Sequence, residues 1–168
     1  KVLHQADTRY GDERVRDFLD LVGDDVPVIV VSDHGEAFGE HDNIFLHGDH
    51  MYDEVLKVPL IVRWPEGAHP NTVDERPVGL ADVGATLLDW AGLETGALDG
   101  VPLPQPGDGE APRRQYFEHI YKGFDRVGVL EAPHKLIRTL PTLGVDLRAR
   151  KGTPGDELFL SLIHISEP

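Results

Sequence analysis

Residues 27–31, Pro-Val-Ile-Val-Val, form an apolar run of β-branched side chains with no polar alternation. This pattern is typical of a strand that is covered on both faces in a parallel sheet. In residues 2–22, before the run, apolar residues recur at helical spacing, and Gly23 follows as a residue that commonly ends a helix. A helix followed by a buried strand predicts an α/β layer.

The next segments repeat this alternation of helix and strand. A short helix is expected around residues 51–57, followed by a strand over 58–63 whose Pro59 favours the strand start or a sheet edge. Asp82 is expected to be the N-cap of a helix that ends at Gly92. These elements extend the predicted α/β layer.

The C-terminal part has a different pattern. Residues 93–112 are rich in Gly, Pro and Asp and predict an irregular connection. Three strand-like segments, 115–120, 126–131 and 134–139, are then separated by turn residues and predict a small antiparallel sheet. Residues 160–168 depart from the acidic character of the preceding chain, so we expect them to be a non-native tail.

Composition excludes several classes of function. The chain has 30 acidic and 16 basic residues and a net charge of −14, and such a surface repels nucleic acid. This acidic, lysine-poor composition also predicts a halophilic protein, since high salt screens the self-repulsion. The absence of cysteine excludes disulfides, thiolate metal sites and a cysteine nucleophile within these residues. No apolar run approaches the roughly 18 residues that a membrane span needs.

Four of the nine histidines and five acidic residues fall within residues 32–50, directly after the predicted buried strand. In an open α/β sheet, ligands bind in the crevice beyond the carboxyl ends of the strands. Asp33 and His34 are at that position, and carboxylate and imidazole both bind metals. The residues alone leave open a plainer interpretation, in which Asp33 caps the turn and His34 is a solvated loop residue.

Several segments, in order and with matching gaps, resemble the second signature block of the sulfatases in the alkaline phosphatase superfamily. They are Val30-Val31-Ser32-Asp33-His34-Gly35-Glu36, Phe38-Gly39-Glu40-His41, His47-Gly48, Tyr52-Asp53-Glu54 and Val58-Pro59-Leu60-Ile61-Val62. Residues 78–93, 98–103, 134–137 and 157–159 are similar to the family's next helix, its following loop and its C-terminal antiparallel subdomain. The resemblance therefore extends over nearly the whole chain.

The resemblance implies roles for individual residues. Asp33 and His34 take the positions of two protein ligands of the active-site divalent cation. Family usage implies Ca²⁺, although the imidazole of His34 would also suit Zn²⁺ or Mn²⁺. His47 lies near the family's basic group that contacts the sulfate ester or protonates the leaving oxygen, and a plainer role in satisfying loop carbonyls stays open. Glu36 is expected to orient a neighbour, and His41 to support the loop.

The family's nucleophile is formylglycine, made from a cysteine or serine in a Cys/Ser-x-Pro/Ala-x-Arg motif, and this chain has no such motif. We therefore expect the C-terminal half of an alkaline-phosphatase-like doubly wound α/β sheet, followed by a small antiparallel α+β subdomain. The expected divisions are residues 1–92 for the catalytic part, 93–159 for a partial subdomain and 160–168 for the tail. The expected substrate is a sulfated small molecule or polysaccharide.

Two other functions remain open at this point. A phosphodiesterase, phosphonate monoester hydrolase or phosphoryl head-group transferase of the same superfamily would share the Asp33-His34-Gly35 motif. In a non-catalytic module, His41, His47 and His50 would bind zinc, although their spacing resembles no common zinc signature.

Half of a doubly wound sheet leaves the strand over residues 28–31 with an unpaired neighbour and an uncovered apolar face. We therefore expect the 168-residue chain, expressed alone, to aggregate or to form a loosely packed state without turnover. Calorimetry and analytical ultracentrifugation would check this, and a sharp cooperative melting transition from a pure monomer would contradict it.

Overall fold

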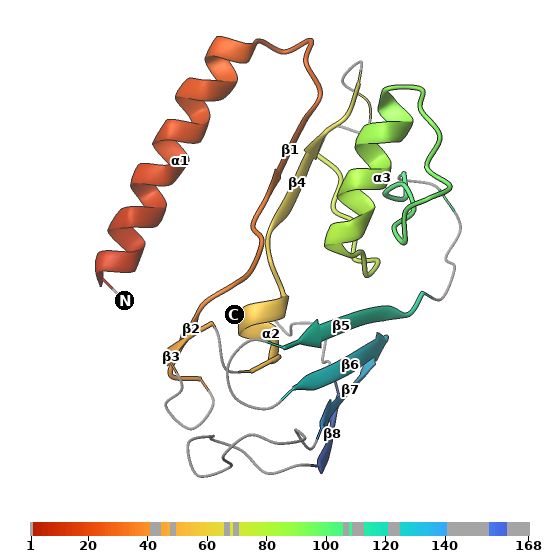
Figure 1. The fold of residues 1–168 in the computed structure, drawn as a ribbon. Coiled ribbons are helices and arrows are strands. Elements are labelled where there is room, and N and C mark those ends of the chain that lie inside the picture. Colours follow the sequence, from red (N-terminus) through yellow and green to blue (C-terminus); the bar gives the residue numbers. More distant parts are fainter. Residues whose placement is uncertain are drawn as a thin grey trace.

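The computed structural model describes residues 2–40, 45–47, 50–65, 68, 71–105, 108, 113–120, 125–140 and 155–160. Helices and strands are mixed along the chain, as expected (Figure 1). The helices are α1 (Val2–Val22), α2 (Asp53–Leu56) and α3 (Leu80–Trp90). The strands are β1 (Val28–Val31), β2 (Ala37–Phe38), β3 (Phe45–Leu46), β4 (Leu60–Arg63), β5 (Gln115–His119), β6 (Arg126–Glu131), β7 (His134–Thr139) and β8 (Gly155–Leu160).

The predicted buried strand forms as β1, but it pairs antiparallel with β4, from Val28 opposite Arg63 to Val31 opposite Leu60. The prediction of a parallel sheet was therefore wrong for this pair. An apolar run specifies a strand, whereas the direction of pairing depends on a partner distant in sequence. β1 is also less buried than predicted, since its first three residues are half-buried and Val31 is exposed. The helices α1 and α3 flank the strand pair on opposite sides (Figure 1).

α1 has the predicted span, and Gly23 ends it with a φ of +78°. The Arg63 guanidinium, at the end of β4, donates hydrogen bonds to the carbonyls of Gly23 at 2.7 Å and Val26 at 3.0 Å. These bonds tie the turn between α1 and β1 to the strand pair. The apolar side chains Phe18 and Leu21 are 56% and 84% exposed, as expected for a helix whose apolar stripe needs a further partner. None of the described helices is both long and apolar enough to cross a membrane.

The described residues that follow β1 include two short strands. β2 and β3 form a two-residue antiparallel ladder, with Ala37 opposite Leu46 and Phe38 opposite Phe45. The short helix α2 follows, and β4 starts directly after Pro59, as its sequence predicted. Met51, Val55 and Ala37 are buried, so this region carries part of the small apolar core.

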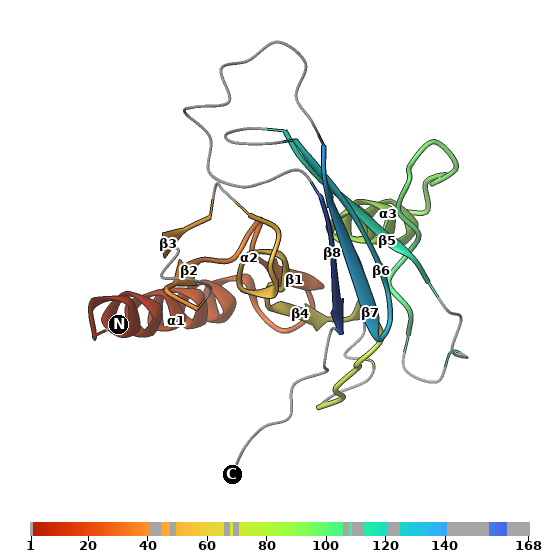
Figure 2. The same ribbon diagram turned by 90° about the horizontal axis from the view of Figure 1, so that it is seen from below.

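The predicted antiparallel sheet is confirmed. Its strand order is β5-β6-β7-β8, and all three neighbouring pairs are antiparallel (Figure 2). β8 includes Leu160, the first residue of the segment expected to be a tail, and 161–168 lie outside the described residues. In β7, Lys135, Ile137 and Thr139 are buried and alternate with less buried residues, so one face of this sheet is covered.

The N-terminus of α3 is held by a buried carboxylate. Asp82 was expected to be the N-cap, but the cap is Gly79 and Asp82 lies three residues further on. The fully buried Asp82 carboxylate accepts hydrogen bonds from the amides of Gly79 at 2.7 Å and Val101 at 3.1 Å, and it forms a two-point ion pair with Arg113. A carboxylate in this position still caps the helix, and it also holds the loop after α3 and the start of β5.

We expect Asp82→Asn in the full-length polypeptide to lower the free energy of unfolding by about 3 kcal/mol, because Arg113 would lose its anion. Burial raises the pKa of the Asp82 carboxyl, but hydrogen bonds from Arg113, Gly79 and Val101 outweigh it and hold that pKa below its ordinary value of 3.8. This stabilisation is therefore present above pH 3.8 and is lost as the pH falls through the folded-state pKa.

Urea denaturation at several pH values would measure both effects. Asp89→Asn, on the exposed side of the same helix, is the control and should change stability by less than about 0.5 kcal/mol. Equal losses in the two variants would contradict the role given to Asp82.

Candidate active site

Local hydrogen bonds shape the turn directly after β1. The Asp33 carboxylate accepts the amide hydrogen of His34 at 2.9 Å, and the Ser32 hydroxyl donates to the His34 carbonyl at 2.7 Å. Serine and aspartate commonly form such bonds to neighbouring backbone groups outside regular structure. The Asp33 and His34 side chains are 87% and 42% exposed, so both remain accessible to a ligand.

A longer-range contact fixes the same turn against α2. The Gly35 amide donates to the Val55 carbonyl at 2.8 Å. A Cβ atom at Gly35 would overlap the carbonyl oxygen of Glu54, so only glycine allows this approach. The turn is thus bound to a second segment of the chain.

The ring of His34 has a defined orientation. Its Nδ1 lies 2.8 Å from the Gly35 carbonyl oxygen, which can only accept, so Nδ1 carries the proton and Nε2 presents a lone pair. Nε2 is 3.7 Å from Oδ1 of Asp33. Two donors that bind one ion at 2.0–2.6 Å lie at most about 5 Å apart, so this pair has the spacing that a shared cation requires.

His47 joins this pair from a segment 11 residues beyond Glu36. Its ring stacks on that of His34, with centroids 3.9 Å apart and planes at 22°. Its Nδ1 lies 2.8 Å from the Glu36 carboxylate, which fixes the ring and leaves Nε2 for another partner. The three residues expected from the sequence, Asp33, His34 and His47, therefore cluster, and Glu36 contacts His47 as an orienting residue would.

Of the other two histidines of this region, His50 is not part of the cluster. His50 is buried, with its Nδ1 accepting the Tyr52 amide hydrogen at 3.3 Å, and His41 lies outside the described residues. Within the described ranges, no group of three or more His, Asp or Glu side chains is placed to hold a metal. Asp33 and His34 would thus supply two of the four to eight ligands that Zn²⁺ or Ca²⁺ takes.

Sequence reasoning missed a lysine contact close to the site. Lys135 in β7 forms an ion pair with Asp53 and donates to the Met51 carbonyl at 3.4 Å. The one signal in the sequence is a lysine that takes an inward position in the alternating strand 134–139, next to Ile137.

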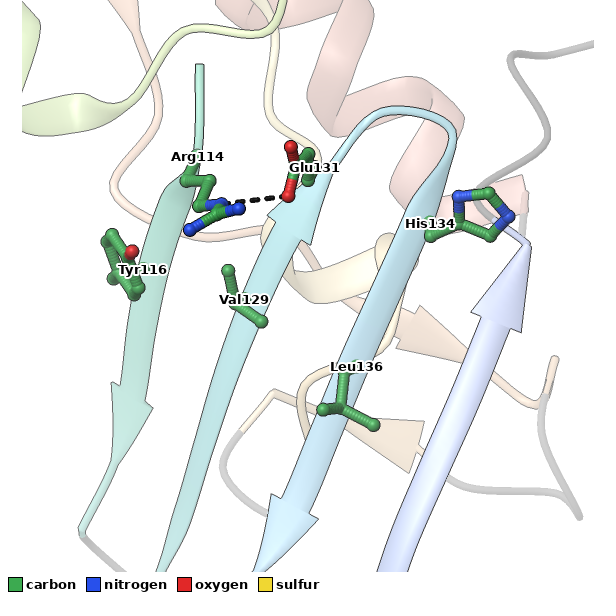
Figure 3. A pocket seen from close by; sticks show the side chains of 6 residues that line it. All are labelled: Arg114, Tyr116, Val129, Glu131, His134 and Leu136. Atoms are coloured by element: carbon green, nitrogen blue, oxygen red, sulfur yellow. Dashed lines mark hydrogen bonds and ion pairs between the residues drawn. The ribbon is translucent and has the colours of Figure 1, made fainter. Parts of the chain in front are cut away.

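A separate shallow pocket of about 300 Å³ lies on the antiparallel sheet (Figure 3). Its rim includes an ion pair between Arg114 and Glu131 at 2.8 Å. Its lining residues His134 and Leu136 alternate along β7 with the buried Lys135, so the pocket opens on the sheet face opposite to the one that contacts α2. It is not part of the cluster around His34.

The family model for sulfatases matches residues 4–93, a range that includes all four residues of the cluster. The chain belongs to the sulfatase family. This confirms the resemblance to the sulfatases of the alkaline phosphatase superfamily and the α/β fold that it implied.

Three curated relatives show how much of a sulfatase the chain represents. An uncharacterized sulfatase, YidJ, of Escherichia coli is 37% identical over 67 residues, covering 40% of this chain and 13% of the relative. The N-acetylglucosamine-6-O-sulfatase of Bacteroides thetaiotaomicron is 27% identical over 117 residues, covering 65% and 21%. The multifunctional alkaline phosphatase superfamily protein PehA of Trinickia caryophylli is 37% identical over 95 residues, covering 54% and 18%. The chain thus spans about a fifth or less of their length.

A solved structure has the same fold. It is described as BT4656 in complex with its substrate D-glucosamine-2-N,6-O-disulfate, and it superposes with a TM-score of 0.59 at 21% sequence identity. The match covers 88% of this sulfatase chain and 30% of that one. The fold of this chain, over most of its length, therefore follows the architecture of that structure.

Proposed function

We propose that this chain contributes part of the active site of an enzyme that hydrolyses sulfate esters. The observation that carries the proposal is the cluster in which Asp33 and His34 share a cation-compatible spacing and the His47 ring stacks on His34. Membership of the sulfatase family supports the same reaction.

Asp33 and His34 would hold a divalent cation, through a carboxylate oxygen and Nε2 respectively. We propose Ca²⁺, with Zn²⁺ and Mn²⁺ as the alternatives that an imidazole ligand suits. The cation would supply positive charge for binding the sulfate oxygens. That positive charge matters because the chain has a net charge of −14, and its excess of acidic residues repels an anionic ester.

His47 is proposed as the general acid. Glu36 holds Nδ1, so a proton on Nε2 points away from Glu36 and is available to the ester oxygen. As the sulfur–oxygen bond breaks, its electron pair goes to the leaving oxygen and the Nε2 proton neutralises it, giving an alcohol. The attacking group is proposed to be a hydrated formylglycine, and no residue of this chain is assigned that role.

The proposed substrate is a sulfated saccharide. The name of the Bacteroides relative specifies a sulfate on N-acetylglucosamine, and the ligand of the similar structure is a disulfated glucosamine. A sugar hydroxyl is a poor leaving group, so its ester depends strongly on proton donation, which suits the role proposed for His47.

Asp33→Ala in the full-length polypeptide should lower the rate of sulfate release from glucosamine 6-sulfate by more than about a hundredfold. Loss of a residue that only supports a metal ligand costs about 10–100-fold, and loss of the ligand itself should cost more. Bound metal, measured by elemental analysis, should fall in parallel while circular dichroism stays unchanged. Asp89→Ala removes the same charge from an exposed position and should retain activity. Full activity in Asp33→Ala, or a higher kcat/KM for phosphodiesters or phosphonates in the parent enzyme, would contradict the proposal.

His47→Gln should lower kcat by about 10²–10⁴-fold on a sugar sulfate but much less on 4-nitrophenyl sulfate, whose leaving group needs no proton. Glu36→Gln should show the same selectivity with a smaller loss, about tenfold to a hundredfold. Steady-state kinetics with both substrates would measure this. Equal losses on the two substrates would remove the general-acid role and leave His47 as a structural residue.

A further inference from the structure

The antiparallel sheet contains a buried lysine, Lys135, whose ammonium contacts the segment around α2. Lys135 is 4% exposed, and lysines are almost never buried to this extent unless they are paired. Within the sheet its backbone lies between Leu130 of β6 and Phe159 of β8. Two polar partners of its ammonium come from outside the sheet, from the segment around α2.

Those partners lie at the start of α2. The Lys135 ammonium pairs with the carboxylate of Asp53, the first residue of the helix, and donates to the Met51 carbonyl at 3.4 Å. A four-residue helix is not stable by itself, since so short a helix does not repay the cost of its nucleus. Tertiary contacts must therefore set the position of α2, and Lys135 supplies a charged one.

α2 in turn holds the turn that carries Asp33 and His34. The Val55 carbonyl accepts the Gly35 amide hydrogen at 2.8 Å, and the Glu54 carbonyl lies where a Gly35 side chain would be. A shift of α2 would thus move Gly35 together with the residue before it, His34. Figures 1 and 2 both show α2 next to the antiparallel sheet, and in Figure 1 it lies on the side toward β2 and β3.

We propose that Lys135 is a positioning residue, which fixes the Asp33–His34 turn through α2. The antiparallel sheet then acts on the candidate site without contributing a group to it. The inference rests on the proposed function only for the ligand that the turn binds. The position of the turn can be measured separately.

The test is hydrogen exchange in the full-length polypeptide. Lys135→Met keeps an unbranched, apolar side-chain stem and removes the ammonium and its charge. Exchange at the Gly35 amide and in peptides spanning α2 should rise about tenfold or more, the change expected from losing a charge-assisted hydrogen bond. Exchange in β6 should stay unchanged. Arg114→Met removes an ion-paired cation from the opposite face of the same sheet and should leave Gly35 protected.

Unchanged exchange at Gly35 in a folded Lys135→Met variant would overturn the inference, as would equal increases in β6 or in Arg114→Met. If Lys135→Met does not fold, Asp53→Asn is the deciding variant. The Asp53 side chain is 42% exposed, and asparagine keeps one acceptor oxygen there, so this variant is expected to fold. It should raise Gly35 exchange in the same direction, and no rise would again overturn the inference.

A metal titration separates this inference from the proposed function. Lys135→Met should weaken Ca²⁺ binding about tenfold, as loss of a supporting residue does. If exchange at Gly35 rises in Lys135→Met but Asp33→Ala keeps full activity, the positioning role of Lys135 is retained and the sulfate-ester site is rejected. Loss of activity in Asp33→Ala with unchanged exchange in Lys135→Met would do the reverse.

Discussion

The close approach of Gly35 to α2 is the contact on which the candidate site depends. β1 ends at Val31, and the following turn could leave the strand in many directions, because its own hydrogen bonds are local and exposed. The amide of Gly35 on the Val55 carbonyl selects one of them. Since any side chain at Gly35 would overlap the Glu54 carbonyl, the choice of residue and the position of α2 are linked. The direction in which the Asp33–His34 turn leaves β1 follows from that link.

The excess of acidic residues limits how the chain can bind an anionic substrate. A sulfate ester is an anion, and this chain has almost twice as many acidic as basic residues. Several of its described cations already have partners in the fold, as Arg113 does with Asp82, Arg114 with Glu131 and Lys135 with Asp53. In the proposed site, the positive charge would come from a bound cation and from an imidazolium. The acidic residues nearby then have a use, since Asp33 would bind the cation and Glu36 orients His47.

The sequence was sufficient where a structure depends on local pattern. The span of α1, the stop at Gly23 and the strands β5, β6 and β7 all follow from periodicity and turn residues. It was insufficient where distant segments meet. The apolar run of β1 does not reveal an antiparallel partner some 30 residues later. Asp82 is a residue type that favours the N-cap, but it lies inside α3, where its carboxylate pairs with the distant Arg113. Each of these features depends on a residue that no local window contains.

The same distinction applies within the candidate site. The residues proposed to bind a cation or transfer a proton, Asp33, His34 and His47, lie close together in sequence and match the pattern of a family, so the sequence alone was sufficient to predict them as candidates. The residue proposed to position them, Lys135, lies in the antiparallel sheet, and its partner Asp53 in α2 is 82 residues away in the sequence. A motif can therefore specify the reacting groups while their geometry depends on a subdomain that carries none of them. In this member of the sulfatase family, we therefore infer that the antiparallel sheet is part of the scaffold of the candidate site rather than an appendage to it.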